Sequence, residues 1–220
     1  DMRWIVAEQP WTQYLTWIFQ VMPVFFFVGG YANAASWTSA RKAPESLDAW
    51  DCYQRGLWNL WRFTTPGFDS AESYFQRAIA ADPGFALAHI GRARSLQLQA
   101  RVVEAREAAG RARVLGARST ARERGHVEAL AIAVEGDAVR ALAAIAEHLV
   151  EFPRDAMVLS PATGVYGLLG FSGRQDRNEA LAALLDPLAG AYGEDWWFLG
   201  AHGFALTEAR GWAAGAPPTG

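Results

Sequence analysis

Apolar side chains recur every three or four positions along most of the chain after residue 46, which is the spacing of amphipathic helices. Breaks rich in Pro, Gly and Asp interrupt this pattern and predict where one helix ends and the next begins. The pattern predicts an all-α fold. Its helices are expected over residues 47–63, from 69 or 70 to 81, from 86 onward, over 138–151 and 178–191, and from 196 onward.

The turn between the first two predicted helices is expected to be longer than usual. Pro66 and Gly67 lie within it, and we interpret them as helix breakers. Asp69 or Ser70 is then expected to cap the second helix. Glu72 is expected in the first turn of that helix, where its carboxylate would face the positive helix end.

The spacing of small and large residues within these helices repeats. Ala71, Phe75, Ala78 and Pro83 have the A-x3-F-x2-A-x4-P spacing of the second half of a tetratricopeptide (TPR) repeat, which has about 34 residues. Small residues occupy equivalent positions in the following units, and Pro153 closes the third unit. These small residues are Ala93, Ala105, Ala112, Ala129 and Ala141.

This resemblance implies a TPR-like superhelix of stacked helical hairpins. Small residues let paired helices approach closely, and large residues such as Phe75 and Leu96 fill the spaces between hairpins. A fourth unit is expected to start at Ala156 and to have its second helix over 178–191. A fifth opens at Trp196, so we predict about four hairpins around a concave groove.

Longer runs resemble particular repeat families. From about residue 78 to 210 the chain resembles the tetratricopeptide repeat protein 38 family, whose members have no assigned reaction to carry over. The runs that carry this resemblance are 78–89, 121–130, 170–177 and 195–202. Residues 48–63 instead resemble the TPR segments attached to bacterial cyclases and transcriptional regulators.

The N-terminal segment has a different character. No Asp, Glu, Lys or Arg occurs from Gln9 to Ala40, and residues 17–31 resemble a transmembrane segment of the acyltransferase three family. Those membrane O-acyltransferases need many spans and a histidine ahead of this segment, whereas His89 is the first histidine of this chain. Two alternatives to a repeat protein therefore stay open: a fragment of a membrane O-acyltransferase fused to a repeat domain, or an artificial or mis-assembled fusion without native function.

Two interpretations of this segment also stay open. The uncharged stretch exceeds the ~20 residues that a membrane-spanning helix needs, and aromatic residues between Trp11 and Trp37 suit an interface. Arg41 and Lys42 would then leave the repeats in the cytoplasm, anchored to the inner membrane. Alternatively, residues 17–28 cap one end of the helical stack. We expect three parts: a hydrophobic segment over 1–41, a repeat domain over 42–212 and a tail over 213–220.

Charge and cysteine content narrow the choice of partners. The formal net charge is −3, which argues against a nucleic-acid surface, since such surfaces are basic. Cys52 is the one cysteine, so the chain has no intrachain disulfide and no cysteine metal cluster. We therefore expect no nucleic-acid partner, a protein or peptide partner, and membrane association only through the N-terminal segment.

No pattern in the sequence predicts catalysis. His126 and Glu128 are two positions apart and do not share a helix face, and H-E-x-x-H, P-loop and G-x-S-x-G motifs are absent from the sequence. The glycine-containing run 170–177 is interpreted as a turn between helices, with Asp176 as the cap of the next helix. We predict no catalytic residue, no cofactor, no metal site and no enzymatic activity.

The predicted function is that of a binding scaffold whose concave groove takes a peptide or a helix. First-helix positions supply the candidate groove residues, which are Tyr53, His89, Arg92, His126, Trp197 and His202.

Overall fold

The computed structural model describes residues 47–164 and 166–210, and the regular structure of these residues is entirely helical, without a strand. The predicted all-α class is thus confirmed for them. The hydrophobic segment 1–41 and the tail 213–220 lie outside the described residues. The helices are α3 (Leu47–Leu60), α4 (Thr65–Ala81), α5 (Ala86–Leu98), α6 (Val102–Gly116), α7 (Ala121–Glu135), α8 (Ala138–Glu151), α9 (Ala156–Leu159), α10 (Arg177–Leu185), α11 (Ala189–Tyr192) and α12 (Trp196–Arg210), with 3₁₀ turns at Ser160–Ala162 and Asp186–Leu188.

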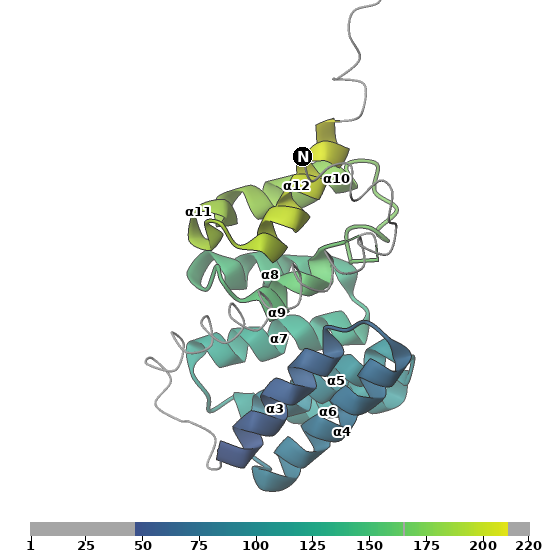
Figure 1. The fold of residues 1–220 in the computed structure, drawn as a ribbon, viewed down its shortest axis with the longest axis vertical. Coiled ribbons are helices and arrows are strands. Elements are labelled where there is room, and N and C mark those ends of the chain that lie inside the picture. The colour runs from purple at the N-terminus through teal and green to yellow at the C-terminus, as the bar shows by residue number, and fades with distance from the viewer. Residues whose placement is uncertain (1–46, 165, 211–220) are drawn as a thin grey trace, which may run out of the picture.

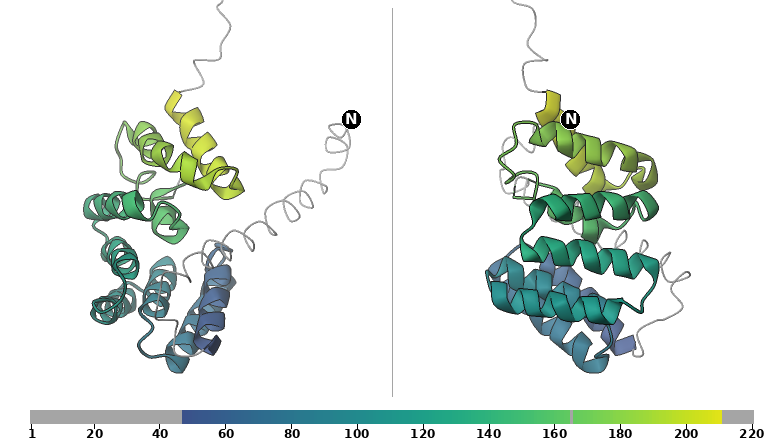
Figure 2. Two further views of the ribbon diagram at one scale, coloured as in Figure 1. Left: turned by 90° about the vertical axis from the view of Figure 1, so that its left-hand side faces the viewer. Right: turned by 180° about the vertical axis from the view of Figure 1, so that it is seen from behind.

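Consecutive helices pack side by side and form a stack along the long axis of the molecule (Figure 1). Helices α3 to α6 lie together at one end of this axis and α10 to α12 at the other, with α7 to α9 between them. The path of the stack is curved, and α3 and α12 return to the same side of it (Figure 2). The short connections between neighbours make each pair antiparallel, as in an αα-hairpin.

The start of α4 differs from the prediction. Pro66 lies in the first turn of α4 and does not break a helix, because the missing N–H of a proline costs nothing where backbone N–H groups have no helical partner. Thr64, and neither Asp69 nor Ser70, caps this helix by accepting a hydrogen bond from the backbone N–H of Gly67 at 3.2 Å. The helix therefore begins earlier, and the preceding turn is shorter, than the sequence suggested.

Phe75 fills the space between the first two hairpins. Its ring is fully buried and lies between Gly56 of α3 and Gly91 of α5. A Cβ atom at Gly56 would be 2.6 Å from this ring, and one at Gly91 would be 2.7 Å away. The two glycines thus make room for one phenylalanine, and three helices meet around it.

The later units fit the prediction unevenly. Helix α8 has the predicted bounds, 138–151. The predicted helix over 178–191 begins at Arg177 but is interrupted by the 3₁₀ turn that contains Pro187. Helix α9 has four residues, because Pro161 follows within a 3₁₀ turn and Gly164, with φ of 79°, ends the helical path. The fourth unit therefore has a much shorter first helix than a regular hairpin.

The two ends of the described chain are in contact on the inner side of the curve. The rings of Trp61, just after α3, and Trp197 of α12 meet edge to face with centroids 5.8 Å apart. Met157 of α9 packs on the apolar cluster of the first hairpin. The first hairpin thus reaches across to the last units. In the part of the chain that the structure describes, no helix has the length and apolar character of a membrane span.

Candidate functional site

A buried carboxylate forms the centre of a polar cluster in the interior. Asp155 is 4% exposed, and its position follows from the chain path. Helix α8 ends at Glu151, Pro153 turns the chain, and Asp155 becomes the N-cap of α9. Its Oδ1 accepts the backbone N–H of Val158 at 3.4 Å, which leaves Oδ2 for side chains.

Two histidines share that second oxygen. His126 Nδ1 of α7 lies 2.9 Å from Asp155 Oδ2, and His148 Nε2 of α8 lies 3.0 Å from the same atom. An ionised carboxylate only accepts hydrogen bonds, so each of these ring nitrogens carries the donated proton. We call Asp155, His126, His148 and Arg122, whose Nη2 is 3.8 Å from Asp155 Oδ2, the Asp155 cluster.

The charge of the cluster is stabilised by its donors. Burial alone would raise the pKa of Asp155, but the charge of His126, the hydrogen bonds from both histidines and the charge of Arg122 outweigh burial and hold this pKa well below its usual range. Arg122 is half-buried and links the cluster to solvent. Asp155 is therefore ionised wherever the protein is folded near neutral pH.

Two tyrosines extend the cluster toward both ends of the stack. Burial and the charge of Asp155 raise the pKa of Tyr53 in α3 and of Tyr192 in α11 above the ordinary value of a phenol. The hydroxyl of Tyr192 and Nε2 of His126 are buried and have no hydrogen-bond partner among the described residues. Both tyrosines remain neutral phenols, and two polar atoms near the carboxylate are unsatisfied.

Tyr53 and His126 are thus brought into one region, around Asp155, but both are buried. The Tyr53 ring packs against Phe75 and Phe85 with centroids 5.9 and 5.1 Å away. Neither residue offers much surface to a partner in this conformation. Their assignment as partner contacts remains a prediction.

His89 and Arg92 lie elsewhere, between α5 and its neighbours. His89 is buried, with Nε2 3.2 Å from the Pro83 carbonyl oxygen, and burial lowers its pKa. Arg92 Nη2 lies 3.4 Å from Glu72 Oε1. Glu72 is buried in the middle of α4 and also accepts from Arg101 Nη1 at 2.5 Å, so the expectation that it faces the helix N-terminus is wrong, because α4 starts at Thr65.

Trp197 and His202 lie on α12. Trp197 is partly buried between Trp61 and Tyr192, whose ring centroid is 6.2 Å away. His202 Nε2 lies 2.6 Å from Asp186 Oδ1 across the α10–α12 contact. Trp197 is therefore the predicted groove residue that lies where the two ends of the stack meet, and His202 links neighbouring elements.

Asp176 occupies the N-cap position of α10 without capping it. Its carboxylate oxygens accept from Arg174 at 2.8 and 2.6 Å, and no side-chain hydrogen bond reaches the helix. The run 170–177 is nevertheless a turn between helices, as the sequence suggested.

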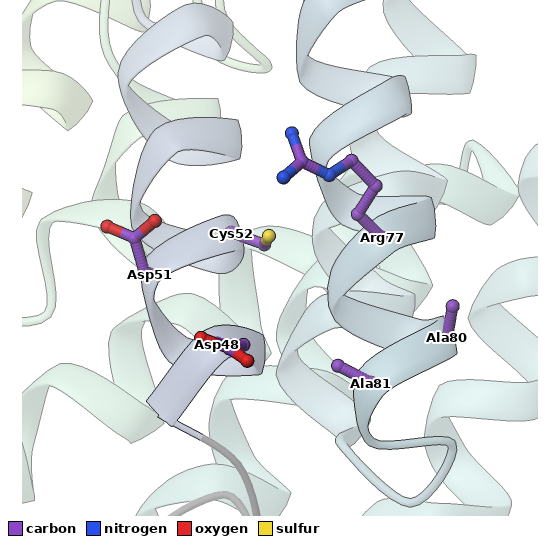
Figure 3. Close-up of a pocket in the computed structure, with 6 residues that line it drawn as sticks. All are labelled: Asp48, Asp51, Cys52, Arg77, Ala80 and Ala81. Carbon is purple, nitrogen blue, oxygen red and sulfur yellow. The ribbon is translucent and has the colours of Figure 1, made fainter.

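An open hollow of about 450 Å³ lies between α3 and α4 of the first hairpin (Figure 3). Asp51 is held by Arg55 at 2.8 Å and points away from the hollow, whereas Cys52 and Arg77 point into it. Its lining residues are Asp48, Asp51, Cys52, Arg77, Ala80 and Ala81. Among the described residues, no group of three or more His, Cys, Asp and Glu side chains is arranged to hold a metal ion.

Sequence reasoning missed the residues that organise the interior. Asp155 was overlooked, although an Asp two positions after the Pro153 turn is a helix-cap signal that the sequence contains. The link from His148 to Asp155 crosses the turn after α8, so no periodicity within one helix indicates it. Trp61 lies outside the repeat positions, so no local pattern indicated its contact with Trp197.

The Asp155 cluster has the elements of a His–Asp pair, since His126 is oriented by a carboxylate and has a second, unbonded ring nitrogen. That nitrogen is buried, and no hydroxyl or thiol donates to it within the described residues. The arrangement suits the joining of α7, α8 and α9 by charged hydrogen bonds.

Comparisons of the whole chain with family models, with curated proteins and with solved structures find no match.

Proposed function

We propose that this chain is a TPR-like helical-repeat scaffold that binds a protein or peptide partner and catalyses no reaction. One observation carries the proposal: the small residues expected at the helix contacts of the repeat are all fully buried. They are Ala71, Ala78, Ala93, Ala105, Ala112, Ala129 and Ala141. Small buried residues at this spacing are what the close approach of paired repeat helices requires.

The large residues of the pattern support the same register. Phe75 and Leu96 are fully buried, and each lies between helices of successive pairs. Stacked hairpins of this kind present extended surfaces and mostly serve binding. The repeat register and the curved stack are therefore what support a scaffold.

Partner contact is proposed on the inner side of the stack, around the junction of its ends. Trp61 and Trp197 are partly exposed there, and Phe63 beside Trp61 is 60% exposed. Phe63 has φ of 48°, an unfavourable backbone for a bulky residue, and such conformations cluster at binding sites. Aromatic side chains of this type dominate binding energy at protein interfaces.

Arg92 of α5 is a second, polar candidate for partner contact, apart from this junction. Its side chain is 28% exposed, and its partner Glu72 is held by Arg101 as well, so Arg92 can turn to a ligand without leaving the carboxylate unpaired. Tyr53 and His126 act behind the surface, as supports for the helices that present it.

A peptide selection tests the proposal. A random-peptide phage library is panned on the immobilised full chain, and the affinities of selected peptides are measured by fluorescence anisotropy. We expect Trp197→Ala and Arg92→Ala to weaken binding about tenfold or more, which is the scale of an interface hot spot. Val114→Ala, on the exposed surface of α6, is the matched control and should leave affinity unchanged.

The result that would sink the scaffold proposal is a library without enriched peptides, or selected peptides that bind the Trp197 and Arg92 variants as tightly as the original chain. Thermal unfolding of each variant must show a folded protein, so that lost binding is not mistaken for lost structure.

A further inference from the structure

The solvent-exposed face of α12 is apolar and uncharged over most of its length. Trp196, Leu199 and Phe204 are 48%, 50% and 42% exposed, and Gly200 and Gly203 lie between them. Their spacing of three and four positions places all five on one side of the helix. Two of its three exposed large side chains are aromatic, whereas those that α6 exposes are valines.

The opposite side of α12 is apolar too. Phe198 and Ala205 are fully buried in the cluster that joins α12 to α10. A helix with apolar residues all around is normally covered on all sides. Exposed valines on other helices differ, because charged residues stand next to them, as Glu104 does beside Val103.

The exposed face has room for another segment. A Cβ atom at Gly200 or Gly203 would meet nothing within 4 Å. Two glycines between large side chains leave a notch into which the backbone of a second segment fits, as ridges fit into grooves at helix contacts. The face has no charge before Glu208, so its complement is an uncharged apolar segment.

We propose that residues 17–28 of the same chain cover this face of α12. These residues lie within the stretch from Gln9 to Ala40 that has no charged residue. They supply large apolar side chains in number, among them Trp17, Ile18, Phe19, Phe25, Phe26 and Phe27. The match is between an uncharged aromatic segment and an uncharged aromatic face, and it does not depend on the proposed peptide-binding function.

The connection is long enough. From residue 28 to Leu47 the chain spans up to about 60 Å when extended, at roughly 3.3 Å per residue. Leu47 begins α3, whose far end lies near α12 because Trp61 and Trp197 are in contact. The 14-residue α3 is about 20 Å long, so Leu47 lies well within reach of α12. A tether of this kind raises the local concentration of the segment to about the millimolar range.

Cross-linking in the full chain tests this docking. Phe25→Cys combined with Leu199→Cys pairs the segment with the face, and Phe25→Cys combined with Val103→Cys is the control on α6. Val103 is exposed, and the native Cys52 is buried, so the unmodified chain should give no product. A short bismaleimide is added at low protein concentration, and linked peptides are identified by mass spectrometry. We expect about tenfold more intrachain product from the Leu199 pair than from the Val103 pair.

A second measurement gives the same answer without a cross-link. The Leu199→Cys variant alone should react slowly with a maleimide, and adding Phe25→Asp and Phe26→Asp should speed the reaction severalfold. Equal products from both cysteine pairs, or a Leu199 link that joins two chains, would overturn the proposal, the latter in favour of a second copy. Loss of the link on adding phosphatidylcholine–phosphatidylglycerol vesicles, with the chain floating with them, would overturn it in favour of a membrane.

Discussion

Trp61 and Trp197 meet edge to face, with ring centroids 5.8 Å apart, although they lie near opposite ends of the described chain. In an open stack each unit contacts only its neighbours. This contact instead joins the first hairpin to α12 across the curve. We therefore expect the stability of one end of the stack to depend on the other.

Removing either tryptophan should reveal that dependence. We expect Trp61→Ala and Trp197→Ala each to lower the free energy of unfolding, and the double variant to lose less than the sum by about 0.5–1.5 kcal/mol, the value of an aromatic pair. Urea unfolding of all four proteins gives this coupling energy. Trp196→Ala is the control partner for Trp61→Ala and should combine with it additively, because Trp196 is exposed on another side of α12.

Gly91 should not tolerate a methyl group. Its Cβ would lie 2.7 Å from the ring of Phe75, which is fully buried and also lies against Gly56, so the ring has little room to move away. We expect Gly91→Ala to destabilise the protein by about 1–3 kcal/mol, as overpacked cores do. Thermal and urea unfolding measure the change.

Gly110→Ala is the matched control, since nothing lies within 4 Å of a Cβ at this exposed position in α6. It should stabilise the helix by about 0.5–1 kcal/mol. A Gly91→Ala protein as stable as the original chain would contradict the wedged position of Phe75.

An element is predicted well from the sequence where its signal lies within a few neighbouring residues. Proline and alanine spacing is local, so it predicted the start of α5 at Ala86, the bounds of α8 and the start of α12 at Trp196. Pro66 was misread because proline both ends helices and begins them. The difference rests on Thr64, whose capping bond only the structure reveals.

The candidate site was predicted less well than the fold. His126 was selected for its position in a repeat, but its role depends on Asp155, which lies in another unit. Such pairs form by the stacking of units, and no periodicity within one helix encodes them. The assignment of Trp197 as a groove residue stays a prediction, and the structure places its ring against that of Trp61.

Gly125 is required by the Asp155 cluster. A Cβ on Gly125 would lie 2.5 Å from His148 Nδ1, so the ring would have to turn and its Nε2 would leave Asp155. We expect Gly125→Ala to cost about 1–3 kcal/mol of unfolding free energy. In an Asp155→Asn background the cost should be clearly smaller, because the hydrogen bond that it breaks is already weakened. Urea unfolding measures both costs, and equal costs in the two backgrounds would show that Gly125→Ala does not act through the Asp155 cluster.

Stability should depend on acid through Asp155. Its pKa in the folded protein lies below the ordinary value of 3.8, because the histidines and Arg122 favour the carboxylate more than burial opposes it. A depressed pKa means that folding favours the ionised form, so this stabilisation is complete above about pH 4–5 and is lost as the pH falls below that range.

Asp155→Asn removes this dependence. At neutral pH we expect it to lower the free energy of unfolding by about 3–5 kcal/mol, because the buried cluster loses its one anion. The difference in unfolding free energy between the original chain and the variant should then narrow as the pH falls from about 5 to 3. In this range Asp155 becomes protonated in the unfolded chain, which lowers the unfolding free energy of the original chain and not that of the variant. Urea unfolding of both proteins across this range measures the gap. A gap that stays constant or widens in acid would show that the charge of Asp155 does not hold α7, α8 and α9 together.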